Sequence, residues 1–98
     1  MVNIVFHPET VEEYRDAFDW YFHRNRSIAE KFRREVERAV EMIQQYPQSW
    51  YKFDETHRKF LLHRFPYSII YRLDTDKKIW ILAVAHQKRE EGYWLSRE

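Results

Sequence analysis

The sequence predicts a single α+β domain, residues 1–98, in which a helical hairpin packs on a largely antiparallel, twisted sheet. Two stretches of the first half repeat apolar residues at helical spacing, and each follows a capping signal. The second half alternates at a period of two, which is typical of strands. Residues 79–85 are continuously apolar, which indicates a strand with a neighbour on each side and helices over at least one face. These observations give the element order β-α-α-β-β-β.

The first strand and the first helix follow from the opening residues. Residues 2–6 form a β-type run that ends at His7 and Pro8, because proline has no N–H to donate to a strand ladder. Thr10 and Glu13 have the spacing of a capping box, and so predict the start of a helix. Its apolar stripe comprises Val11, Tyr14, Phe18, Tyr21 and Phe22.

The second helix follows after a sharp turn. The first helix is expected to end near residues 24–25, where asparagine tolerates the left-handed cap conformation. Ser27 and Glu30 repeat the capping-box spacing, and Pro47 predicts the end of the second helix. Its apolar stripe comprises Ile28, Phe32, Val36, Ala39, Val40 and Ile43. Charges four apart predict the pairs Glu30/Arg34, Lys31/Glu35 and Arg33/Glu37 on a solvated side that also carries Arg38.

Three strands are expected in the second half. After a connection through residues 48–57, residues 60–65 are β-like and Pro66 marks a turn. Residues 67–73 alternate between apolar and mixed positions, and residues 74–78 form a polar turn before the apolar strand. The apolar strand is therefore expected near the centre of the sheet.

Composition excludes several classes of protein. The chain has no cysteine, so it has no disulfide framework, thiolate zinc site or cysteine nucleophile. The longest apolar run is far shorter than the roughly 20 residues of a membrane span, so no membrane association is expected. The first residues lack the features of a signal peptide, which with the absence of cysteine predicts a cytoplasmic protein.

Known catalytic signatures and metal-ligand spacings are absent from the sequence. It has no nucleophile elbow, no glycine-rich phosphate loop and no zinc-protease helix motif. The five histidines do not have the spacing of metal ligands, so we assign no metal and no cofactor. The net charge of +1 is too small for composition alone to predict nucleic-acid binding.

Cationic and aromatic side chains gather in the C-terminal half. His86 directly follows the apolar strand, and Arg89 comes three residues later. These groups can converge at the end of that strand with Tyr93 and Trp94, although Trp94 also suits a core position that docks the C-terminal segment. The sequence therefore predicts a site at this strand end.

Three segments carry a resemblance to a known family. Residues 58–72 read RKFLLHRFPYSIIYR, residues 81–89 read ILAVAHQKR, and Tyr93-Trp94 is followed after two residues by Arg97. Together with the element order, they resemble the RelE/ParE superfamily. The resemblance covers nearly the whole chain and implies the toxin of a type II toxin-antitoxin, or plasmid stabilisation, module, which inhibits growth and is neutralised by a cognate antitoxin protein.

The resemblance leaves two activities open. RelE-like members cut mRNA on the ribosome without a metal, and ParE-like members inhibit DNA gyrase. A nuclease site would comprise Lys59, Arg64, His86, Arg89 and Tyr93 as catalytic residues. Leu61, Ser68 and Gln87 stand where the nuclease members tend to place lysine or arginine.

These replacements favour the ParE-like gyrase inhibitor over the mRNA endonuclease. In a gyrase inhibitor the target-binding residues would be Arg89, Trp94 and Arg97. A third possibility is a degenerate module that still binds an antitoxin but is no longer toxic.

Overall fold

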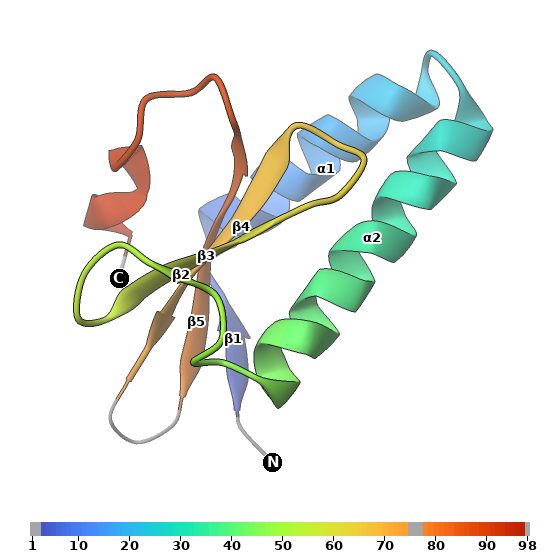
Figure 1. The fold of residues 1–98 in the computed structure, drawn as a ribbon. Coiled ribbons are helices and arrows are strands. Elements are labelled where there is room, and N and C mark those ends of the chain that lie inside the picture. Colours follow the sequence, from blue (N-terminus) through green and yellow to red (C-terminus); the bar gives the residue numbers. More distant parts are fainter. Residues whose placement is uncertain (1–2, 75–77, 98) are drawn as a thin grey trace.

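The chain forms two helices and a five-stranded sheet (Figure 1). The computed structural model describes residues 3–74 and 78–97. Their elements are β1 (Ile4–Phe6), α1 (Pro8–Phe22), α2 (Arg26–Gln45), β2 (Tyr51–Lys52), β3 (His57–Leu61), β4 (Tyr67–Leu73), β5 (Ile79–His86) and the 3₁₀ helix η1 (Tyr93–Ser96). The sheet order is β1-β5-β4-β3-β2, with β1 parallel to β5 and the other pairs antiparallel. The predicted α+β class and largely antiparallel sheet are confirmed.

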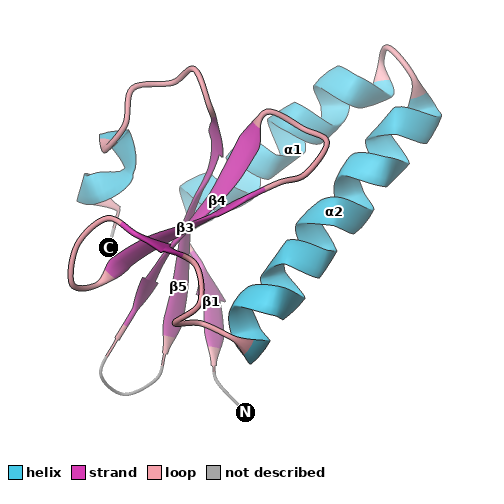
Figure 2. Cartoon of the chain, viewed as in Figure 1, coloured by secondary structure: helices cyan, strands magenta, loops and turns pink. Residues whose placement is uncertain are grey.

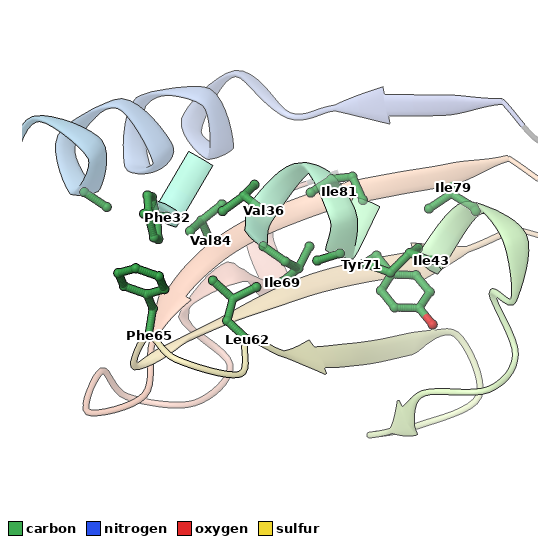
Figure 3. Packing of buried hydrophobic residues seen from close by; sticks show 12 residues of the cluster. Phe32, Val36, Ile43, Leu62, Phe65, Ile69, Tyr71, Ile79, Ile81 and Val84 are labelled. Atoms are coloured by element: carbon green, nitrogen blue, oxygen red, sulfur yellow. The ribbon is translucent and has the colours of Figure 1, made fainter. Parts of the chain in front are cut away.

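The two helices cover one face of the sheet, and the C-terminal segment covers part of the other (Figure 2). On the helical face, Phe32 and Ile43 of α2 belong to one buried cluster with Ile69 and Ile81 of the sheet (Figure 3). On the opposite face, Trp94 of η1 packs with a second cluster of buried sheet residues. Strand β5 therefore has β4 on one side, β1 beside its first residues on the other, and cover on both faces, as its apolar sequence predicts.

The start of α1 differs from the prediction. His7, not Thr10, is the N-cap, since its ring accepts the Glu9 N–H, and Pro8 opens the helix. The Thr10 hydroxyl instead donates to the carbonyl of Ile81 at 3.0 Å. The capping-box prediction for Thr10 is wrong because β1 ends at Phe6, so that α1 lies beside β5 and its first turns supply partners for that strand's backbone.

The turn between the helices also differs from the prediction. Asn25 has an extended backbone, with φ −161°, and not a left-handed one. Its side-chain oxygen accepts the N–H groups of Ser27 and Ile28, so Asn25 is the N-cap of α2. Glu30 is bonded to Arg33 and does not complete a capping box. A side-chain oxygen next to unpaired helix N–H groups explains why asparagine caps the second helix here.

One of the three predicted ion pairs on α2 forms. Arg33 binds Glu37 at 3.0 Å, as predicted. It also binds Glu30 at 2.7 Å, although Glu30 was predicted to pair with Arg34. Glu35 does not pair with Lys31 in the described structure. Its carboxylate accepts the N–H groups of the two residues that follow Leu62 in the β3–β4 loop.

The strand predicted over residues 60–65 lies closer to the N-terminus in the structure. Strand β3 begins at His57, because Asp54 accepts the N–H groups of Thr56 and His57 and turns the chain into the strand. It ends at Leu61; the N–H of Leu62 still bonds to the carbonyl of Tyr67 in β4, and the N–H groups of His63 and Arg64 then bond to Glu35 of α2. The two-residue strand β2 was not predicted. Of the predicted segments, Val2 of the first strand and residues 75–77 of the polar turn lie outside the described residues.

None of the described helices combines the length and the apolar character that crossing a bilayer requires.

Removing the Thr10 hydroxyl tests its role at β5. We expect Thr10→Val to lower the free energy of unfolding by about 1 kcal/mol, because the buried hydroxyl bonds to a strand carbonyl. Thr10→Ser keeps the hydroxyl and is the matched control, expected to lose less. Urea titrations followed by circular dichroism measure both. A Thr10→Val variant as stable as the parent would show that this hydrogen bond contributes nothing.

Candidate functional site

Most of the predicted site residues meet at the C-terminal end of β5. A hollow of about 370 Å³ lies there between β3, β5 and the C-terminal segment, and we call it the β5-end pocket. Its lining includes the predicted residues Lys59, His86, Arg89, Tyr93 and Trp94. His86, Arg89, Tyr93 and Trp94 therefore converge at this strand end, as predicted. Lys59 of β3 lines the same pocket.

Gly92 turns the chain so that η1 returns to the sheet. It is the only glycine of the sequence, and its φ of 91° lies in the left-handed region that other residues rarely adopt. The helix η1 starts immediately after it, which places Tyr93 in the pocket wall and Trp94 against the sheet. The position of both aromatic residues thus depends on this turn.

Aromatic rings lie against two cations of the pocket, Lys59 and Arg89, and Glu13 also binds Arg89 at 3.4 Å. The Lys59 ammonium lies 5.1 Å from the ring centroid of Tyr51 and 5.3 Å from that of Phe53. The Arg89 guanidinium lies 3.6 Å from the centroid of the Tyr93 ring. Such contacts orient a cation while leaving part of it open to a partner. Arg89 remains exposed and reachable from solvent.

His86 is fixed in one tautomer by the backbone. Its Nδ1 accepts the N–H of Lys88 at 3.1 Å, so the neutral ring carries its proton on Nε2. The Tyr67 ring meets it edge-on, with centroids 5.1 Å apart. A neutral His86 can therefore donate, but not accept, at Nε2.

The hydroxyl of Tyr93 is engaged within the chain. It donates to Glu13 at 2.7 Å. Burial raises the pKa of Tyr93 above its usual value, and the hydrogen bond to the Glu13 carboxylate raises this pKa further. At neutral pH the phenol therefore stays protonated, with its proton directed toward Glu13.

Glu13 is the centre of this network, although the sequence alone does not indicate that it is a site residue. Its carboxylate accepts the N–H of Val84 at 3.0 Å and binds Arg97 at 2.8 Å. The Arg97 guanidinium also donates to the carbonyl of Leu82. The capping-box spacing predicts only a role for Glu13 at the start of a helix. No sequence signal connects Glu13 with residues more than 70 positions away.

Arg97 has a structural environment. It is 7% exposed, and its guanidinium is held by Glu13, by Glu9 and by the Leu82 carbonyl. A partner protein cannot reach this guanidinium while the segment is docked. The target-binding role predicted for Arg97 therefore does not fit its position, and we assign it to docking of the C-terminal segment.

Trp94 is likewise part of the packing. It is 3% exposed, and its ring lies 5.2 Å from that of His57 and 5.3 Å from that of Phe53. The His57 ring that Trp94 packs against is itself held by Asp54. The N–H groups of Thr56 and His57 lower the pKa of Asp54 to about 2. Trp94 thus shapes the floor of the pocket and offers little surface to a target.

Arg64 lies apart from the other predicted residues. It is in the β3–β4 loop, beside α2, and does not line the β5-end pocket. The predicted nuclease set is therefore divided between two places. Within residues 3–74 and 78–97, no three His, Cys, Asp or Glu side chains are grouped so that they could hold a metal ion.

Comparisons with known proteins agree with this architecture. The family model described as "ParE toxin of type II toxin-antitoxin system, parDE" matches residues 4–91. Among solved structures, a chain of the "Chromosomal ParDE TA system from P. aeruginosa" is similar in fold, with a TM-score of 0.74 and 21% sequence identity. The match covers 88% of this chain and 96% of that chain. A comparison with curated protein sequences finds no significant match. Because the family model spans most of its length, the chain belongs to the ParE toxin family of type II toxin-antitoxin systems.

Proposed function

We propose that the chain inhibits cell growth by binding DNA gyrase through the surface around the β5-end pocket, and that a cognate antitoxin holds it inactive. Membership of the ParE toxin family supports an antitoxin partner. The observation that carries the choice of a binding mechanism is the engagement of Tyr93 by Glu13. The exposed Arg89, seated on the Tyr93 ring, is the contact residue that we propose for the target.

The chemistry of RNA cleavage explains why that engagement matters. Cleavage needs a base for the 2′-hydroxyl, an acid for the leaving oxygen and cations for the transition state. Tyr93 cannot serve as the base, because its pKa is raised, and its proton is directed toward Glu13. Arg64, which would supply a cation, lies outside the pocket. The pocket is therefore better suited to binding than to proton transfer.

A ribosome-dependent mRNA endonuclease is the second candidate. One observation favours it: Lys59, His86, Arg89 and Tyr93 line the same pocket. In this mechanism the Nε2–H of His86 would donate a hydrogen bond to the leaving oxygen, and Lys59 and Arg89 would bind the phosphate. Tyr93 would first have to leave Glu13.

We propose that the antitoxin covers an apolar groove between the two helices. The groove has a volume of about 500 Å³, and its walls come from both helices and from the sheet beneath them. Its apolar lining residues are Phe6, Val11, Tyr14, Val36, Val40, Ile69, Ile81 and Val84. Phe6 and Val11 are among the exposed large apolar residues of the chain. An amphipathic helix presenting an apolar face would bury them.

A charge placed in the groove tests this assignment. We expect Val11→Glu to weaken binding of the cognate antitoxin by at least about tenfold, because a carboxylate would be buried against apolar surface. Leu95→Glu is the control, since Leu95 is exposed but lies outside the groove. Titration calorimetry of the purified partners gives both affinities. Equal affinities for the two variants would contradict an antitoxin site in the groove.

Substitutions in the β5-end pocket separate the two toxic mechanisms. In a gyrase supercoiling assay we expect Arg89→Ala to weaken inhibition by at least about tenfold, as for an arginine at the centre of an interface. Lys88→Ala removes a neighbouring exposed charge outside the pocket lining and is the control. Tyr93→Phe keeps the ring beneath Arg89, so inhibition should be unchanged. Circular dichroism verifies that each variant is folded.

Primer extension on mRNA from a cell-free translation reaction tests the endonuclease mechanism. Ribosome-dependent cuts that fall by a factor of about 10² to 10⁴ in Tyr93→Phe would establish the endonuclease and contradict the gyrase proposal. If the parent chain, freed of antitoxin, affected neither gyrase nor mRNA and left growth unchanged, the degenerate module would remain.

A further inference from the structure

A second cationic surface lies away from the β5-end pocket. It joins one side of α2 to the β3–β4 loop around a hollow of about 480 Å³. We call it the α2–loop basic face and define it by Lys31, Arg34, Arg38, His63 and Arg64. All five side chains are exposed. The charges of α2 alone indicate an ordinary solvated side of a helix. The fold places His63 and Arg64 of the loop beside them.

The positive charge of this face is poorly compensated. Among the described residues, no ion pair forms with Lys31, Arg34, Arg38 or Arg64. Glu35 is the single carboxylate in the lining. Its Oε1 accepts the backbone N–H groups of His63 and Arg64, at 2.8 and 3.1 Å. Glu35 thus fixes the loop against the helix and holds Arg64 near the helical cations.

Two neighbouring acidic residues of α2, Glu30 and Glu37, form their ion pairs with a different arginine, although the charge of Arg34 still acts on Glu30. Glu30 and Glu37 both bind Arg33, on an adjoining side of the helix. The charge spacing in the sequence predicts pairs of Arg34 with Glu30 and of Lys31 with Glu35, which would have neutralised two of the four permanent cations of this face. Because neither forms, four permanent cations and one histidine face solvent around one carboxylate.

The spacing of the cations suits a chain of phosphates. A helix rises about 1.5 Å per residue, so Lys31 and Arg38 lie about 10 Å apart along the axis of α2. One strand of a DNA duplex presents a phosphate about every 3.4 Å along its axis, about three over that length. Three of the five residues are arginines, whose planar guanidinium matches a phosphate with two hydrogen bonds.

The lining argues against a protein partner. Stable protein interfaces are centred on aromatic or aliphatic anchors, with charges at the rim. The six residues that line this hollow are all charged or histidine, and none is apolar. Nucleic-acid binding without sequence recognition requires clustered cations and no apolar anchor.

We propose that the α2–loop basic face binds the sugar-phosphate backbone of a nucleic acid without reading its sequence. This function goes beyond the proposed gyrase contact, which uses the β5-end pocket. It would hold the toxin close to a nucleic acid while the β5-end pocket remains free for its target.

Fluorescence anisotropy with a labelled DNA duplex of about 20 base pairs and arbitrary sequence tests the proposal. For about four phosphate contacts, the slope of log affinity against log salt concentration should be about −3.6 between roughly 50 and 200 mM salt. The double variant Arg34→Glu and Arg38→Glu should lose at least about tenfold in affinity and about two units of slope. An RNA of the same length, measured in parallel, shows which nucleic acid is preferred.

A charge-matched control separates this face from net charge. The double variant Arg24→Glu and Lys88→Glu changes the charge by the same amount at exposed positions outside the face, and should bind as the parent does. Equal losses in the two variants, or no binding by the parent at low salt, would overturn the proposal. Binding of a polyglutamate peptide at this face without binding of DNA or RNA would assign it to an acidic protein instead and would also overturn it.

Discussion

The carboxylate of Glu13 connects the three parts of the molecule on which the β5-end pocket depends. It lies on α1, accepts the N–H of Val84 on β5, and binds Tyr93 and Arg97 of the C-terminal segment. The need for such a connection arises from the sheet. Strand β1 pairs with β5 from Ile79 only as far as Ile81. The part of β5 after Ile81 therefore has no strand on that side. Backbone groups there require partners, because unpaired buried N–H and C=O groups are costly.

The sequence predicted the class of fold and failed where long-range contacts choose between local options. Periodicity identified both helices and the central strand, because those patterns reflect burial directly. Thr10 and Glu13 fit a local capping box, but the edge of β5 offered them stronger partners. Arg97 was predicted to bind the target because nothing near it in the sequence indicates that Glu13 lies beside it. Convergence at the end of β5 was predictable, because it follows from the order of residues after the strand.

Two surfaces of different chemistry result from this fold. The β5-end pocket combines aromatic rings with cations that those rings orient, which suits selective contact with a protein. The α2–loop basic face has charge without apolar anchors, which suits a phosphate backbone. Arg64 lies on the second surface, although its motif associates it with the first. The fold thus divides one cluster of the sequence into two places, each consistent with a different partner.

Hydrogen exchange of the Glu13→Gln variant tests most directly whether Glu13 holds the C-terminal segment in place. The glutamine side chain has nearly the same shape but lacks the negative charge that binds Arg97 and Tyr93. The account predicts faster exchange at Val84 and across residues 87–97, with protection in α2 and in the β3–β4 pair unchanged. Exchange in residues 87–97 equal to that of the parent chain would contradict it, because the segment would then be held by the packing of Trp94 and by the other contacts of Arg97.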